Sequence, residues 1–166
     1  MKFCLVDRIE SIEPGKRIVA VKALSLAEEY LADHFPAFPV MPGVLMVEAL
    51  VQTAAWLVRL ERDWSCSLVT LERARNVRYG NFVAPGMTLR TDVELLSLED
   101  GLAKVKAIGS TGEGSQTVQG KLELRCRNVA DVAPAAAGSD ERIIADLKRR
   151  FALIGGPEAL AAATGG

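Results

Sequence analysis

The chain has 166 residues, which is enough for one domain with a hydrophobic core and short for two. Apolar residues make up 49% of the sequence, which excludes a disordered chain. Lysine and arginine together number 20, against 21 aspartates and glutamates. The resulting net charge of -1 gives no basic field that would indicate nucleic-acid binding.

The three cysteines, Cys4, Cys66 and Cys126, are odd in number and lie far apart in the sequence. We therefore expect neither a disulfide framework nor a CxxC-type metal site, and this usage fits a reducing compartment. The single histidine has no clustered cysteines near it, which argues against a zinc site. We expect no metal and no bound cofactor.

Two segments bear on location. Residues 1–10 carry too many charges, and too short an apolar run, for a signal peptide. Residues 44–58 are mostly apolar, but they number only 15 and contain Glu48 and Gln52, which favours a buried core helix over a membrane span. We expect a soluble, cytoplasmic protein.

The first 40 residues are mixed in pattern. Pro14 and Gly15 predict a turn, and residues 18–23 then suit a strand with two partly covered faces. Ser25 could cap a short helix over residues 26–31, with Glu28 at the capping-box distance.

A long helix is predicted over residues 44–60, just after Pro42, which suits a first helical position. It is apolar nearly all round, and a helix of that kind is enclosed by other structure. Arg59 and the charged residues 61–63 are predicted to mark its exit into solvent.

Residues from about 66 to 127 are predicted to form strands. Apolar and polar side chains alternate with a period of two over residues 118–126, and residues 89–95 repeat the pattern. Turn signals separate these runs at Pro85-Gly86, Asp100-Gly101 and residues 111–114. The chain is therefore predicted to be an α+β domain, in which an antiparallel sheet wraps around one long central helix.

The C-terminal part differs in composition. Residues 128–139 are rich in alanine and predict a linker. Residues 140–154 predict a surface helix whose apolar residues are spaced by four, and Gly155-Gly156 end it. The last ten residues are small and are expected to fray. The predicted organisation is a domain at 1–127, a linker at 128–139 and a C-terminal helical extension at 140–166.

The most informative stretch is residues 34–52, which read HFPAFPVMPGVLMVEALVQ. An acid such as Glu48 inside an apolar helix either finds polar partners or keeps its proton, and a protonated carboxyl is a general acid. His34 supplies an imidazole that can act as a base near neutral pH. The N–H of Gly43, at a helix start, could polarise a carbonyl oxygen. The spacing does not tell whether His34 and Glu48 meet within one chain.

This stretch resembles the 3-hydroxyacyl-acyl-carrier-protein dehydratases of bacterial fatty-acid synthesis, the FabZ-type enzymes with the hotdog fold. The resemblance extends to LVDRI at residues 5–9, PGK at 14–16 and APG at 84–86, and it covers about residues 3–127. Glu48, where a related dehydratase–isomerase branch carries aspartate, favours the dehydratase.

The resemblance implies loss of water from a (3R)-hydroxyacyl thioester to give the trans-2-enoyl thioester. His34 would take the C2 proton, Glu48 would help the hydroxyl leave, and the Gly43 N–H would hold the thioester carbonyl. Gln52 would orient Glu48 or line the site, and Val44 would contact the substrate.

The resemblance also implies partners. The substrate would arrive on the phosphopantetheine arm of acyl carrier protein or on CoA. A homodimer would take the histidine of each site from one chain and the glutamate from the other, and three dimers could form a hexamer.

The sequence departs from the family at Asp33, where glycine is usual, and at Gly80 and Asn81, where a basic pair is common. Carrier-protein docking would then fall to candidates among the arginines near this segment, which are Arg73, Arg75 and Arg78. Two other functions stay open: a non-catalytic acyl-thioester-binding or assembly protein, and an acyl thioesterase.

Overall fold

The computed structural model describes residues 3–35, 37–112 and 114–164. Pro36 of the motif and Glu113 of a predicted turn lie outside the described residues. The sheet has the strand order β1-β2-β4-β5-β6-β3, and each neighbouring pair is antiparallel. Its strands are β1 (Arg8–Glu13), β2 (Arg17–Ala23), β3 (Leu68–Tyr79), β4 (Thr88–Glu99), β5 (Leu102–Thr111) and β6 (Ser115–Arg127).

The alternation predicted for β6 is confirmed. Val118, Leu122 and Leu124 are buried, whereas Lys121 between them is exposed. The two-residue loop between β4 and β5 has positive φ at Asp100 and Gly101, 48° and 73°, as a tight hairpin turn requires.

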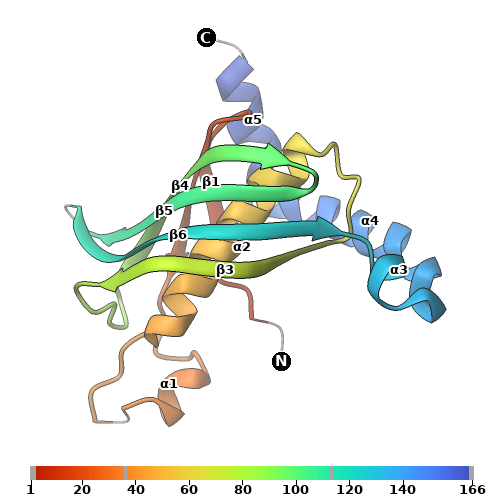
Figure 1. Cartoon of the computed structure of the whole chain (residues 1–166). Helices are drawn as coiled ribbons and strands as arrows, with labels where there is room; N and C mark the ends of the chain where they lie inside the picture. The colour runs from red at the N-terminus through yellow and green to blue at the C-terminus, as the bar shows by residue number, and fades with distance from the viewer. Residues whose placement is uncertain (1–2, 36, 113, 165–166) are drawn as a thin grey trace.

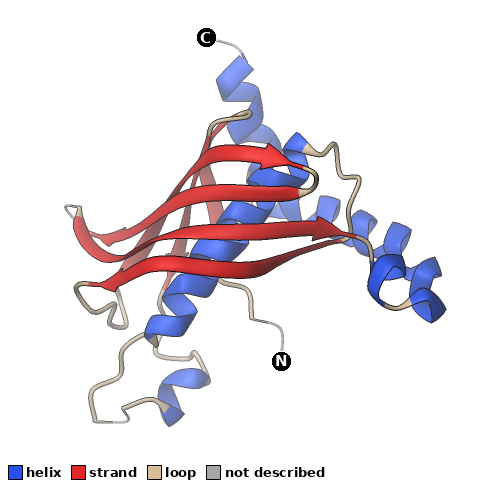
Figure 2. Cartoon of the chain, in the orientation of Figure 1, coloured by secondary structure: helices blue, strands red, loops and turns tan. Residues whose placement is uncertain are grey.

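The helix α2 (Gly43–Glu61) runs along the concave face of the sheet, as Figure 1 and Figure 2 show. Its bounds lie within one residue of those predicted. By length and composition α2 could cross a membrane, but 61% of its most apolar stretch is buried inside the protein. It is the central core helix, and the predicted α+β arrangement of a sheet around one long helix is confirmed.

A chain of hydroxyl groups joins α2 to the sheet. Thr53 and Thr91 are buried, with their hydroxyl oxygens 2.8 Å apart. The Thr91 hydroxyl donates to the carbonyl oxygen of Ala20, 3.1 Å away. The Thr53 hydroxyl donates to the carbonyl oxygen of Ala49 on its own helix, 2.8 Å away.

The C-terminal part contains more ordered structure than the sequence predicts. The helix α4 (Asp140–Leu153) confirms the predicted helix over residues 140–154. The expected linker instead forms α3 (Val129–Val132) and a 3-10 helix (Pro134–Ser139). Residues expected to fray form α5 (Gly156–Thr164), which lies beside β1.

The predicted surface helix α4 also contributes to the core. Phe151 is buried, with its ring centroid 5.9 Å from that of Trp56 on α2 and 5.4 Å from that of Trp64. Ile154 and Ala159 are buried in the same cluster. The extension therefore shares one hydrophobic core with the sheet and α2.

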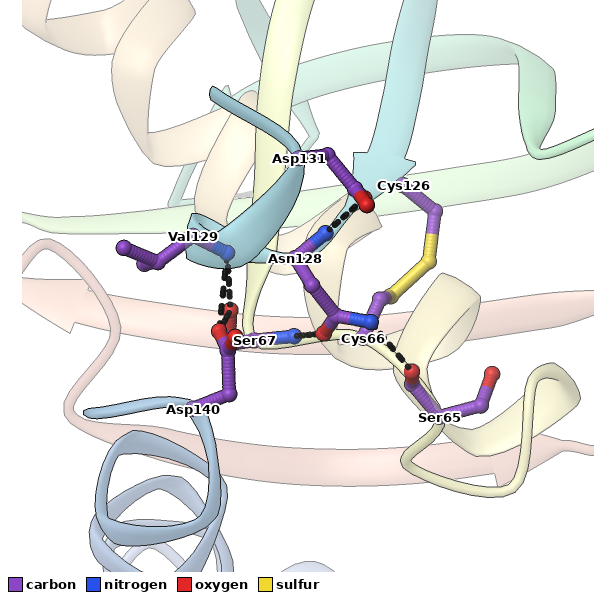
Figure 3. Close-up of a disulfide and its surroundings, with 8 residues drawn as sticks. All are labelled: Ser65, Cys66, Ser67, Cys126, Asn128, Val129, Asp131 and Asp140. Carbon is purple, nitrogen blue, oxygen red and sulfur yellow. Dashed lines mark hydrogen bonds between the residues drawn. A yellow bond between two sulfur atoms is a disulfide. The ribbon is translucent and has the colours of Figure 1, made fainter. Parts of the chain in front are cut away.

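Contrary to the expectation that the cysteines form no disulfide, Cys66 and Cys126 are bonded (Figure 3). They are 60 residues apart in sequence, but β3 pairs with β6 and brings their Cα atoms to 5.9 Å. Cys4 is free and exposed. The sequence alone does not predict this disulfide, because the two cysteines are brought together only by the pairing of β3 with β6.

Polar contacts next to the disulfide fasten the extension (Figure 3). The Asp140 carboxylate accepts hydrogen bonds from the hydroxyl of Ser67 and from the N–H groups of Val129, at 2.8 Å, and Ala130, at 3.1 Å. The Ser67 hydroxyl and these two N–H groups hold the pKa of Asp140 below its ordinary value. The Asn128 side chain accepts from the Ser67 N–H at 3.0 Å.

Candidate active site

The start of α2 presents free backbone donors. Gly43 is its first residue, and Pro42 precedes it. The first N–H groups of α2 that donate hydrogen bonds are those of Leu45 and Met46, and both donate to the Pro42 carbonyl oxygen. Within the described residues, the N–H groups of Gly43 and Val44 donate no hydrogen bond. They can therefore receive a carbonyl oxygen, with the helix dipole favouring negative charge there.

The Tyr79 ring closes over Gly43. A Cβ added to Gly43 would lie 2.9 Å from Cε1 of Tyr79, closer than side chains approach. Val44, predicted to contact substrate, has 71% of its surface exposed. A side chain at position 43 would therefore have to displace the exposed Tyr79 ring, and Val44 is open to a ligand or a second chain.

Glu48 and Gln52 face the N-terminal segment from the middle of α2. The Gln52 amide donates to Glu48 Oε1 at 2.9 Å and to the carbonyl of Phe3 at 3.1 Å. Its oxygen accepts the N–H of Leu5 at 2.9 Å. The backbone of the N-terminal segment therefore holds the Gln52 amide in place, and this amide in turn orients the Glu48 carboxyl group.

His34 directly follows α1 (Tyr30–Asp33), a short helix that lies near the start of α2 (Figure 1). It is half-buried, and its ring lies 4.4 Å from that of Phe35. The predicted helix over residues 26–31 is displaced: Ser25 accepts the N–H of Ala27 in a turn, and α1 begins only at Tyr30.

The segment that leads into α1 is anchored by an ion pair. Lys22 on β2 is buried, and its Nζ lies 2.7 Å from Glu28 and 3.3 Å from Asp7. Burial lowers the pKa of Lys22, but hydrogen bonds and charge from Glu28 and Asp7 outweigh it and raise the pKa above its ordinary value. This anchor holds the segment that carries His34 against the sheet.

One chain does not join His34 to Glu48. Among the contacts of the described residues, His34 meets Phe35, whereas Glu48 meets Gln52. The single chain therefore brings Gly43, Glu48 and Gln52 onto one helix but leaves the imidazole apart from the carboxyl group.

A cavity of about 210 Å³ adjoins Glu48 and Gln52 and continues along α2 to Arg59. Arg59 was predicted to lie at the exit of the helix into solvent, but only 9% of its surface is exposed. The extension covers it, since Leu147 and Arg150 of α4 line the same cavity. Residues 61–63 are exposed as predicted.

The three candidate docking arginines share one face of the sheet. Arg73, Arg75 and Arg78 are exposed on β3, and a register shift between Arg75 and Arg78 keeps all three on the face opposite the buried residues of β6. Arg75 pairs with Glu123 at 3.3 Å. Lys106 and Lys121 of neighbouring strands line a hollow with Arg78.

Comparison with known proteins gives consistent results. A family model described as FabA-like domain matches residues 1–121. The 3-hydroxyacyl-[acyl-carrier-protein] dehydratase FabZ of Janthinobacterium sp. (strain Marseille) is 41% identical over 135 residues, covering 80% of this chain and 86% of that protein. FabZ of Geobacillus thermodenitrificans (strain NG80-2) is 42% identical over 120 residues, covering 72% of this chain and 78% of that protein.

Solved structures agree at the level of fold. The dehydratase heterocomplex ApeI:P from Xenorhabdus doucetiae superposes with a TM-score of 0.65 at 19% identity, covering 80% of this chain and 88% of that one. The smu.793 protein of Streptococcus mutans UA159, bound to acetyl CoA, gives 0.54 at 12% identity, covering 72% and 86%. The fold is the hotdog fold that the motif predicts.

Proposed function

Because the chain belongs to the FabA-like domain family, we propose that it is a 3-hydroxyacyl-acyl-carrier-protein dehydratase of fatty-acid synthesis. The observation that carries this proposal is the arrangement on α2. Free N–H groups at Gly43 precede, by little more than one helical turn, a carboxylate that Gln52 holds in place.

In the reaction, the N–H of Gly43 binds the thioester carbonyl oxygen and stabilises the charge that gathers there when C2 loses its proton. The His34 imidazole takes that proton, and the electron pair of the C2–H bond forms the double bond between C2 and C3. The C3–O bond breaks as Glu48 gives its proton to the leaving hydroxyl, which departs as water. Return of one proton from His34 to Glu48 restores the enzyme.

The active unit of this proposal is a homodimer. Within the described residues no contact joins the His34 imidazole to the Glu48 carboxyl group, and Val44, on the same helix as Glu48, is exposed. The strand β3 is long and lies at the edge of the sheet, and within the described part of the chain it pairs only with β6. Long free edges are normally covered, and a second copy would cover this one. A hexamer would be a trimer of such dimers.

Docking of acyl carrier protein, an acidic partner, is assigned to the exposed arginines of β3. Arg78 immediately precedes Tyr79, whose ring covers Gly43, so the charge lies next to the start of α2. Arg73 and Arg75 extend it along the strand. The same proposal puts the protein in the cytoplasm, although the Cys66–Cys126 disulfide removes the support that the cysteines gave to a reducing compartment.

Hydration of crotonyl-CoA measures the activity in the reverse direction. His34→Ala and Glu48→Gln should each lower kcat/KM by about 10²–10⁴-fold. The control is Glu141→Gln, which removes an exposed carboxylate on α4 and should leave the rate unchanged. Wild-type rates in both site variants would refute the catalytic assignment, and release of free thiol would indicate a thioesterase instead.

Mixing the two inactive variants tests the shared site. Subunits that exchange freely give half heterodimers, each with one site that has both His34 and Glu48. Activity should then recover to about a quarter of the wild-type value. No recovery after demonstrated exchange would show that each site uses a single chain.

A further inference from the structure

The cavity beside Glu48 is closed by the C-terminal extension. One wall is a stripe of α2 that runs from Glu48 through Gln52 and Trp56 to Arg59. The opposite wall comes partly from α4, through Leu147 and Arg150. The matched family region ends at residue 121, so α4 is an addition to it that reshapes the space beside the proposed catalytic acid.

Arg59 is a buried cation that has no acidic partner among the residues that the structure describes. Its Nε is buried and makes no hydrogen bond, and its guanidinium carbon lies 5.2 Å from the centre of the Trp56 ring. Its side chain makes no ion pair with any residue in the described ranges. Burial, and then the charge of Arg150, lower the pKa of Arg59 to about 10, so it stays protonated at neutral pH.

Arg59 and Arg150 line the same cavity, and the charge of Arg150 acts on the Arg59 guanidinium. Arg150 likewise makes no ion pair within the part of the chain that the structure describes. Cations that repel each other in a partly dry site are stabilised by an anion between them, and guanidinium groups bind carboxylates through paired hydrogen bonds. The geometry fits a ligand with a negatively charged end.

The side chains that line the middle of the cavity indicate the chemistry of the uncharged part of the ligand. Between Glu48 and Arg59 the cavity is lined by the apolar side chains Val51, Ala55 and Leu147 and by Gln52, whose amide N–H groups already donate to Phe3 and Glu48. These four side chains have no free N–H for the two amides of a pantetheine arm, which argues against the phosphate end of a thioester carrier as the anion. They suit an alkyl chain.

We propose that this cavity binds an acyl group that ends in a carboxylate, with Arg59 and Arg150 holding that carboxylate while the thioester end lies at Glu48. This inference rests on the proposed dehydratase function. Glu48 and Arg59 are 11 residues apart on the helix, about 16 Å along its axis, and the reach of both side chains shortens the gap. The matching acyl chain has roughly six to ten carbons.

Binding of unreactive saturated thioesters tests the inference without turnover. Calorimetry would compare an eight-carbon ω-carboxyacyl-CoA with its ω-methyl ester. The wild-type protein should bind the acid at least about tenfold more tightly, because the ester removes the charge but keeps the chain. Equal affinities, or tighter binding of the ester, would overturn the inference. Crotonyl-CoA hydration, measured beside this, reports separately on the proposed function.

Three variants identify the residues responsible. Arg150→Met, at a half-buried position, and Arg59→Met should each bring the affinity ratio of acid to ester close to one. Arg142→Met, an exposed position on the same helix, should leave the ratio unchanged. The ratio does not depend on the folded fraction, so loss of stability in Arg59→Met does not imitate the effect. An unchanged ratio in both Arg59→Met and Arg150→Met would refute the assignment.

Discussion

Replacing Phe151 by alanine should destabilise the whole protein rather than loosen only its C-terminal helix. Phe151 is 6% exposed and lies against two rings, those of Trp56 and Trp64. Trp56 belongs to α2, the helix at the centre of the sheet. A cavity at Phe151 is therefore a cavity in the main core.

The expected loss of unfolding free energy is about 3–4 kcal/mol. Truncation of a buried phenylalanine to alanine costs about 3–5 kcal/mol, a range that already includes the loss of its ring contacts. Alanine recovers roughly 0.5 kcal/mol through its higher helix propensity. Leu153→Ala is the matched control on the same helix: its side chain is 86% exposed, and we expect a change within about 0.5 kcal/mol.

Urea unfolding followed by tryptophan fluorescence suits this test. The chain has two tryptophans, Trp56 and Trp64, and both rings contact Phe151. At fixed protein concentration, Phe151→Ala should lower the transition midpoint and leave a single transition with an unchanged slope. A loss below about 1 kcal/mol, or a separate early transition, would refute the shared core, because the extension would then unfold independently.

Three further predictions concern the site, an ion pair and the disulfide. Gln52→Leu should lower kcat/KM for crotonyl-CoA hydration about 10–100-fold, because it releases Glu48. It should also lower the free energy of unfolding in urea by about 1–3 kcal/mol, because the backbone N–H of Leu5 loses its acceptor. Wild-type kinetics would contradict the orienting role of Gln52. Arg17 holds the pKa of Asp92 below its ordinary value of 3.8, so Asp92→Asn should cost up to about 1 kcal/mol above pH 5. Unfolding from pH 7 to 2 should show that difference vanish as the pH falls through the lowered pKa, and a constant difference would refute it. Cys66→Ser should lower the free energy of unfolding by about 4 kcal/mol relative to the oxidised wild type, as expected for a 60-residue separation. A reductant should destabilise the wild type by the same amount. Two free thiols per non-reduced chain in addition to Cys4 would contradict the bond.

The regular parts of the fold follow from local pattern. The period of two over residues 118–126 predicts β6, because each inward side chain meets the same helix. The bounds of α2 are predictable because Pro42 stands just before its first residue and the charged residues 61–63 follow its last apolar turn. In both cases the signal lies within the element or directly beside it in the sequence.

The docking of the extension could not be predicted in this way. The spacing of apolar residues predicts α4, but it does not say which surface covers Phe151. The small residues of α5 indicate fraying only when nothing buries them. Here Gly156 lies so close to Phe151 that a Cβ would be 2.3 Å from the ring, and α5 rests beside β1.

The candidate site divides along the same line. Gly43, Glu48 and Gln52 are close in sequence and on one helix, so the motif identifies them together. Arg59 is on that helix too, but its burial depends on α4, far along the chain. The disulfide between Cys66 and Cys126 likewise exists because β3 and β6 pair.

The hydroxyl chain at the middle of α2 has a consequence for catalytic geometry. A helix that is apolar on nearly every side gains almost the same burial energy at several rotations about its axis. Turning or sliding it would break the contact between the Thr53 and Thr91 hydroxyls, worth about 0.5–1.5 kcal/mol, while the other bonds of these hydroxyls stay within the helix and within the sheet. This contact thus favours one rotational setting over others that apolar burial alone would allow. Because Glu48 lies on the same helix, the rotational setting of α2 also determines the direction in which its carboxylate points.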